Sequence, residues 1–175
     1  MNNIYKYSEA YFTEEQRFKQ IWLWAIVILA SALPWIGLFI QVILGYQIGD
    51  NPAPDMLIIV FLILFGIGFP LMFYSTRLIT MVKEDGIYLR YIPFHFKYKF
   101  YHFDEIEKFE ARKYRPIFEY GGWGIRYGFK GMAYNVYGNM GIQLILKNKK
   151  KVLIGSQKPE QFYEAIVKAI NQKNQ

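Results

Sequence analysis

The sequence predicts an α+β membrane protein, in which an N-terminal transmembrane α-hairpin is followed by an antiparallel β-barrel or sandwich closed by a C-terminal helix. Three observations predict this class. Two long runs near the N-terminus carry no charged residue, and after Arg77 the pattern changes to short β-rich runs separated by turns. Near the C-terminus, apolar residues from Phe162 to Ile170 recur at helical spacing. The 175 residues suffice for a hairpin and one soluble domain.

The two charge-free runs are expected to cross a membrane at about 21–44 and 56–75, as a hairpin over 21–76 with an external loop at 45–55. A bilayer core about 30 Å thick requires roughly 20 apolar helical residues, which each run provides. Helix-breaking residues inside the runs would kink the helices, and the glycines would also allow their close approach. These residues are Pro34, Gly37, Gly66, Gly68 and Pro70.

Positive charges predict the orientation of this hairpin. Lys and Arg occur in the leader 1–20 and after Arg77, whereas the 45–55 loop has neither. Because cytoplasmic flanks are enriched in these residues, we expect a protein of the cytoplasmic (inner) membrane with both termini in the cytoplasm. In the leader, Thr13 followed by Gln16 matches a capping box, which predicts an interfacial helix that begins near Thr13.

The region 77–175 is expected to form the cytoplasmic β domain, with about seven strands. Asp85-Gly86 predicts a hairpin turn, and the alternation of aromatic and other residues from Phe94 to Tyr101 predicts a strand with one aromatic and one basic face. Pro159 is suited to the first turn of the closing helix. The strands are expected at 78–84, 87–92, 94–101, 106–113, 134–137, 142–147 and 151–155.

A family resemblance rests mainly on residues between Arg112 and Pro159. They are Arg112, Tyr114-Arg115-Pro116, Glu119 to Arg126, Gly131, Ala133-Tyr134-Asn135, Gly138, Gly141, Gln143-Leu144, Ile154 to Gln157, and Pro159. In these positions the chain resembles uncharacterised bacterial two-span membrane proteins with a C-terminal pleckstrin-homology-like domain. The resemblance implies this fold for the β domain. It implies no activity, because such folds bind phosphoinositides, peptides or partner domains.

The segment 115–141 is a Gly-rich insertion in the β domain. Glycine serves where the backbone needs positive φ or lies close to another backbone. The insertion therefore forms either a tightly turning strand excursion, the interpretation that we favour, or a loop that holds a ligand. It contains neither of the two Gly-rich motifs that cradle nucleotide phosphates, so no nucleotide cofactor is expected.

A candidate network surrounds Glu119, which lies among Arg112, Arg115 and Arg126. It could be a salt-bridged structural network, an Arg cluster that binds a phosphate or carboxylate, or an active site with Glu119 as general base. We expect Trp123 to pack over the insertion and include Asn135 in this binding or structural set.

Residues for catalysis or metal binding are scarce. His95 and His102, the chain's two histidines, fall on opposite faces of a regular strand, and the chain has no cysteine. We therefore assign no catalytic residue, no metal site and no cofactor.

Four lysines surround Asn148 at the tip of a predicted β-hairpin. They are Lys147, Lys149, Lys150 and Lys151. Region 77–175 has 18 Lys and Arg against nine Asp and Glu, so this tip could contact anionic lipid, at about 1 kcal/mol per well-placed Lys or Arg. It could equally be a solvated loop.

Taken together, these features predict a membrane-anchored binding or scaffold protein that presents its β domain to a protein partner or an anionic lipid surface. The alternatives are an accessory subunit of a larger membrane complex and a membrane-bound enzyme that uses Glu119 and its Arg neighbours. The expected partners are the lipid bilayer and a protein partner or a second copy of the chain. The membrane tether disfavours nucleic acid.

Overall fold

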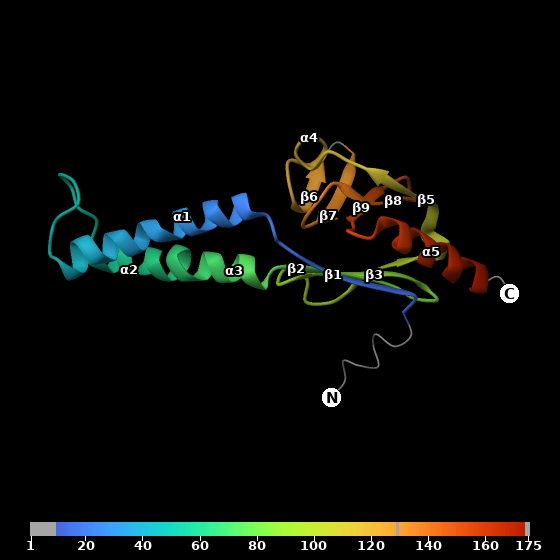
Figure 1. Ribbon diagram of the computed structural model, residues 1–175, viewed down its shortest axis with the longest axis horizontal. Helices are drawn as coiled ribbons and strands as arrows, with labels where there is room; N and C mark the ends of the chain where they lie inside the picture. Colours follow the sequence, from blue (N-terminus) through green and yellow to red (C-terminus); the bar gives the residue numbers. More distant parts are fainter. Residues whose placement is uncertain (1–9, 129, 174–175) are drawn as a thin grey trace, which may run out of the picture. The chain divides into compact units, whose positions relative to one another are not determined.

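The computed structural model describes residues 10–128 and 130–173. These residues form two compact units, and the division does not follow chain order (Figure 1). One unit is the helical hairpin, Phe18–Thr76. The other, the β domain, combines the described residues before Phe18 with those from Arg77 onwards. The chain is therefore α+β, as predicted, but the hairpin is inserted into the β domain and does not precede it.

Two long apolar helices form the helical hairpin. The first comprises α1 (Ile21–Gly37) and the π-helical turn η1 (Leu38–Ile43). The second comprises α2 (Asp55–Phe61), the π-helical turn η2 (Leu62–Gly68) and α3 (Phe69–Ser75). At 23 and 21 residues, both helices are long and apolar enough to cross a membrane, in agreement with the two predicted runs.

The two helices touch closely at Gly66. The Trp35 indole Nε1 donates a hydrogen bond of 3.3 Å to the Gly66 carbonyl oxygen. A Cβ atom at Gly66 would lie 3.1 Å from the same nitrogen. Glycine thus permits the contact, as the sequence predicts for Gly66. At the other end of the helices, the Gln41 amide donates to the Ala53 carbonyl oxygen at 2.6 Å and to the Asp55 carboxylate at 2.9 Å, which closes the connecting loop.

Sheet A is an antiparallel meander with the order β1-β2-β3-β4. Its strands are β1 (Phe12–Arg17), β2 (Arg77–Val82), β3 (Gly86–Ile92) and β4 (Lys99–His102). The predicted turn at Asp85-Gly86 joins β2 to β3. The interfacial helix predicted from Thr13 is wrong, because this segment is strand β1, paired with β2 along its whole length. Its residues alternate between buried and exposed, so tertiary pairing overrides the local capping signal.

Side chains of β1 tie it to the rest of the β domain. Glu14 is 7% exposed, and its carboxylate accepts hydrogen bonds from the Ser156 hydroxyl at 2.7 Å and the Gln157 amide at 2.8 Å. The Gln16 amide donates to the Gly155 carbonyl oxygen at 2.7 Å. Because buried polar groups require such partners, β1 is an integral strand of the domain and not a separate leader.

The strand predicted over Phe94–Tyr101 exists only at its C-terminal end, as β4. Pro93 has no amide hydrogen for a ladder, and the chain turns after it. The His95 amide donates to the Tyr91 carbonyl oxygen at 2.7 Å, and the Tyr91 amide donates to His95 Nδ1 at 3.2 Å. These local bonds replace strand pairing, and the predicted aromatic and basic faces do not form.

Sheet B has the order β5-β8-β9-β7-β6, in which β7 runs parallel to β9 and the other neighbours are antiparallel. The turn η3 (Phe103–Glu105) precedes β5, and the helical turn α4 (Pro116–Tyr120) follows it. The strands are β5 (Ile106–Lys113), β6 (Gly124–Gly128), β7 (Gly131–Asn135), β8 (Met140–Leu146) and β9 (Lys151–Gly155).

Nine strands thus replace the expected seven within the described ranges, and they form two separate sheets, not a closed barrel. The two additional strands are β1, in the segment predicted as a helix, and β6, in the Gly-rich insertion.

Helix α5 (Pro159–Lys173) contacts strands of both sheets, as the C-terminal stripe predicts. Phe162, Ile166 and Ala169 are fully buried. The Phe162 ring stacks on Phe12 of β1 with the ring centroids 5.0 Å apart. The closing helix therefore depends on a strand that precedes the helical hairpin in the chain.

This arrangement predicts that the β domain folds without the hairpin if β1 remains attached. Arg17 and Arg77 are directly opposite each other at the end of the β1–β2 pair, so an Asn-Gly turn can replace Phe18–Thr76. We expect the joined domain to be soluble and β-rich and to unfold cooperatively, as measured by circular dichroism during thermal melting.

The matched control is the fragment 77–175, which lacks β1. Without Phe12 and Glu14, it should unfold at a lower temperature or fail to fold. Equal melting temperatures for the two proteins would show that β1 is dispensable.

Candidate functional site

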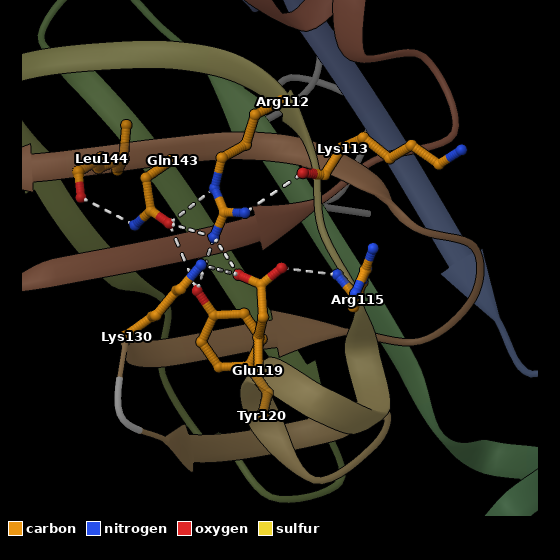
Figure 2. Close-up of polar contacts among 8 residues, drawn as sticks. All are labelled: Arg112, Lys113, Arg115, Glu119, Tyr120, Lys130, Gln143 and Leu144. Atoms are coloured by element: carbon orange, nitrogen blue, oxygen red, sulfur yellow. Dashed lines mark hydrogen bonds and ion pairs between the residues drawn. The ribbon is translucent and has the colours of Figure 1, made fainter.

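Charged and polar side chains gather where the insertion meets sheet B (Figure 2). We call this group the Arg112 cluster. Arg112 comes from β5, Glu119 and Tyr120 from α4, and Gln143 from β8. Lys130 joins them from the turn that leads into β7.

The guanidinium of Arg112 is the centre of the cluster. Its Nη2 donates to the Glu119 carboxylate at 2.9 Å, the Gln143 side-chain oxygen at 2.9 Å and the Tyr120 hydroxyl at 3.1 Å. Its Nε donates to the same Gln143 oxygen at 3.2 Å, and Nη1 donates to the Lys113 carbonyl oxygen at 3.3 Å. Every nitrogen of the guanidinium is thus engaged within the protein.

Glu119 has partners on both carboxylate oxygens. Oε1 accepts the Arg115 backbone amide at 2.8 Å, and Oε2 is 3.3 Å from Lys130 Nζ as well as hydrogen-bonded to Arg112. Burial opposes ionisation of this carboxyl, but the hydrogen bonds from Arg112 and from the Arg115 amide outweigh burial and hold its pKa below its ordinary value. Glu119 is therefore ionised at neutral pH and held by fixed partners. A general base, by contrast, requires a pKa near the working pH.

The remaining predicted residues lie elsewhere or take part differently. The contact of Arg115 with Glu119 comes from its backbone. The Arg126 Nε donates to the Trp123 carbonyl oxygen at 2.8 Å, and the Trp123 indole donates to the Gly138 carbonyl oxygen at 2.9 Å. The Asn135 side-chain oxygen accepts the Gly124 amide at 2.9 Å. These contacts fasten the insertion to its own strands.

Tyr120, Lys130 and Gln143 belong to the Arg112 cluster but were not predicted. For Gln143 a signal exists in strand register: Glu110 pairs with Gln143 in the β5–β8 ladder, which places Arg112 two positions along on the same strand as Glu110. Tyr120 and Lys130 lie outside this ladder, so register gives no signal for them.

Two glycines show how the insertion turns. Gly121, with φ of +71°, ends α4 in a left-handed conformation. Gly131, with φ of +100°, begins β7, and a Cβ atom there would lie 2.3 Å from the Lys151 carbonyl oxygen. Glycine is thus required where the insertion bends back against β9.

A groove beside the insertion contrasts with the Arg112 cluster. It has a volume of about 830 Å³ and lies between β4, the β6–β7 turn and the β8–β9 tip. We call it the lysine groove, because five of its lining residues are lysines and none is acidic. The lysines are Lys99, Lys130, Lys149, Lys150 and Lys151. Tyr101, Tyr127 and Tyr134 also line it.

Carboxylates engage only two of these lysines among the described residues. Lys130 contacts Glu119, and Lys149 forms an ion pair of 2.7 Å with Glu107. Lys99 instead donates to the Tyr134 hydroxyl at 2.6 Å. The groove is therefore an electropositive surface whose charge the domain itself only partly compensates.

Burial shifts the pKa of two aromatic groups in or beside the groove toward their neutral forms. Burial raises the pKa of Tyr101, as does the neighbouring Tyr134 hydroxyl. Burial and then the positive charge of Lys99 lower the pKa of His95, whose ring lies 5.6 Å from that of Tyr134. A neutral His95 can accept the Tyr91 amide at Nδ1, as observed.

Of the four lysines predicted at the β8–β9 tip, three line the groove. Lys147 instead fixes the tip through its backbone, because its amide donates to the Glu105 carbonyl oxygen at 2.9 Å. Lys149 has φ of +64° in the tight turn. The tip is thus joined to the η3 turn.

Strand register places the groove along the length of the domain. At one end of sheet A, which we call the hairpin end, Arg77 lies opposite both Arg17 and Ile92. The far end carries the β2–β3 turn and the β4–η3 junction, where His102 pairs with Gly86. The β8–β9 tip contacts η3 and so belongs to the far end.

A family model matches residues 8–172 of the chain, which is nearly its full length. Its description is a family of unknown function, DUF6141. The chain belongs to DUF6141. No curated protein and no solved structure matches the chain. The match includes β1, the helical hairpin, the Arg112 cluster and the lysine groove, so all four belong to the region that defines DUF6141.

In this DUF6141 member, replacing Glu119 should lower stability. The side chains of Arg112 and Glu119 are only 19% and 12% exposed, so Glu119→Gln weakens a largely buried pair and should cost about 1–3 kcal/mol. The matched change Lys130→Gln removes an ion pair with a 59% exposed lysine and should cost less than about 1 kcal/mol. Urea unfolding in mild detergent measures the loss of unfolding free energy for both variants. Equal losses would show that the contact between Arg112 and Glu119 stabilises the domain no more than the exposed ion pair of Lys130 does.

The same variant should alter the pH dependence of stability. Because folding lowers the pKa of Glu119, its contribution is complete above the ordinary value of 4.5 and is lost as the pH falls through the folded value. Between pH 7 and pH 3, the free energy of unfolding should therefore fall less steeply in Glu119→Gln than in the natural protein. Parallel curves would mean that Glu119 does not titrate with folding.

Proposed function

We propose that this chain is a membrane-anchored binding module that captures an anionic segment of a protein partner in its lysine groove. The observation that carries the proposal is the set of five lysines and no carboxylate among the residues that line the groove. Carboxylate or phosphate groups would complete the charge-assisted hydrogen bonds of Lys99, Lys150 and Lys151. The tyrosines would contribute apolar area and hydroxyl groups.

Membrane anchoring by the helical hairpin is the second part of the proposal. Its support is the length and apolar composition of the two helices, which carry many exposed large apolar side chains. In water such a surface would favour aggregation, whereas in a bilayer it is matched to its surroundings.

The strand pairing also favours one topology. Because β1 pairs with β2, the two chain segments that flank the hairpin lie in one folded domain and hence on one side of the membrane. The Lys and Arg residues of these flanks, and their absence from the 45–55 loop, favour the cytoplasmic side of the inner membrane.

A pleckstrin-homology-like core is the fold that we propose for the β domain. Without α4, β6 and β7, seven strands remain, four in sheet A and three in sheet B, followed by α5. This order supports the proposal of a pleckstrin-homology-like plan, in which the helical hairpin would lie between the first two strands and the Gly-rich insertion between the fifth and sixth. Such domains serve as binding modules in several settings, which agrees with the proposed role.

A topology measurement tests the anchoring. Reporter enzymes fused within the loop after Asp50 and at Gln175 should report opposite sides of the membrane, with the loop outside. Reporters on the same side would exclude the hairpin topology, and an outside C-terminus would reverse the proposed orientation.

A charge-matched comparison tests the groove. The triple variant Lys99→Gln, Lys150→Gln, Lys151→Gln removes the three groove lysines that have no carboxylate partner among the described residues. The control variant Lys108→Gln, Lys113→Gln, Lys158→Gln removes the same charge outside the groove. The probe is a fluorescent poly-glutamate peptide, with full-length protein in neutral-lipid nanodiscs.

We expect the groove variant to bind the probe at least about tenfold more weakly than the control, because a loss of 1.4 kcal/mol is tenfold. Binding should also weaken as salt rises. Equal affinities for the two variants would show that the groove is not the site. Loss of binding to anionic vesicles but not to the peptide would identify lipid as the ligand.

A further inference from the structure

The loop between β3 and β4, residues 93–98, exposes two phenylalanines. Phe96 is 90% exposed and Phe94 is 53% exposed, whereas His95 between them is partly buried. Neighbouring exposed aromatic rings on one short loop form an apolar patch of the kind that marks an interaction surface.

This loop is held in a defined shape from its inner side. His95 is bonded to Tyr91 through both its backbone amide and its ring, at 2.7 and 3.2 Å. The Arg90 Nε donates to the His95 carbonyl oxygen at 3.0 Å. With His95 fixed inward, the flanking phenylalanines are presented outward, and little conformational entropy remains to be lost when they bind.

Strand register places the loop at the hairpin end of sheet A. The loop follows Ile92, which lies opposite Arg77 in the β2–β3 ladder. Arg77 follows Ser75, the last residue of α3, by only two positions. Paired Cα atoms are about 5 Å apart, so the loop begins close to the point where the chain leaves the second apolar helix.

The charges at this end favour an anionic surface. Four cations lie at this end of sheet A or in the loop. Arg17 ends β1, Arg77 begins β2, Arg90 lies two residues before the end of β3, and Lys97 is in the loop. The carboxylate of Glu15, near the end of β1, forms ion pairs with the guanidinium groups of Arg17 at 2.8 Å and Arg77 at 3.4 Å. Cations flanking exposed aromatic rings are the composition of membrane-interface segments.

We propose that the 93–98 loop is a second membrane contact, in which Phe94 and Phe96 enter the headgroup layer of the bilayer that the helical hairpin crosses. This inference rests on the membrane anchoring in the proposed function. The partner that contacts the loop is the bilayer. The residue before the loop pairs with a residue next to the point where the chain leaves the second apolar helix.

The experiment uses the absence of cysteine from the chain, so that one introduced thiol can be labelled alone. Phe96→Cys carries an environment-sensitive fluorophore on full-length protein in vesicles of phosphatidylcholine and phosphatidylglycerol. Tyr127→Cys is the matched control, because Tyr127 is 86% exposed and lines the lysine groove. Leu64→Cys, inside the second apolar helix, reports insertion of the hairpin.

We expect the label at position 96 to emit at shorter wavelength, to lose accessibility to iodide and to be quenched by headgroup-labelled nitroxide lipid. The label at position 127 should remain accessible to iodide and unquenched. Because Phe94 and Phe96 would insert apolar rings, the protection should persist at 1 M NaCl, where the Debye length is about 3 Å.

The controls separate the ways in which the proposal can fail. Quenching at position 64 by acyl-chain nitroxide, with position 96 as accessible as position 127, would overturn the loop contact and leave the anchoring intact. No quenching at position 64 would overturn both. Protection of position 96 that persists in detergent and rises with protein concentration would indicate a second copy of the chain and would also overturn the lipid contact.

Discussion

Pairing between β1 and β2 joins parts of the chain that are separated by the whole helical hairpin, Phe18–Thr76. Closing a flexible loop of this length is entropically unfavourable, although each doubling of length adds only about 0.6 kcal/mol. The two packed helices reduce this cost, because they return the chain toward its starting point. Phe12 and Glu14 then extend the pairing to α5 and to the end of β9. The core of the β domain thus depends on this pairing.

Charge compensation distinguishes the two polar regions of the β domain. In the Arg112 cluster, the guanidinium and the Glu119 carboxylate bond to each other and to neutral partners. Few of their hydrogen-bonding positions therefore remain to bind a ligand. In the lysine groove, like charges lie together without acidic lining. Lys130 belongs to both regions. Its ammonium group lies 3.3 Å from the Glu119 carboxylate, so the structural cluster and the groove share this residue.

Sequence patterns predicted what depends on local periodicity, and missed what depends on pairing between distant segments. The length of the charge-free runs was enough to predict both apolar helices. The apolar stripe at Phe162 and Ile166 was enough to predict α5. The strand β1 was missed because Thr13 and Gln16 match the start of a helix. Only the pairing of this segment with Met81, Val82 and the rest of β2 makes it a strand. Arg112 and Glu119 were recognised by charge. Gln143 and Tyr120 were missed because neutral partners give no signal before register is known.

The insertion of the helical hairpin between β1 and β2 also orders events during biogenesis. The ribosome makes β1 first, and at about 5–20 residues per second β2 follows roughly 3–12 seconds later, after both apolar helices. Under the membrane anchoring that we propose, a hairpin left half inserted would place β1 and β2 on opposite sides of the bilayer. Such a chain could not complete sheet A and would expose unpaired β1 to proteases. If the hairpin crosses the membrane as proposed, assembly of the β domain would therefore act as a check on its complete insertion.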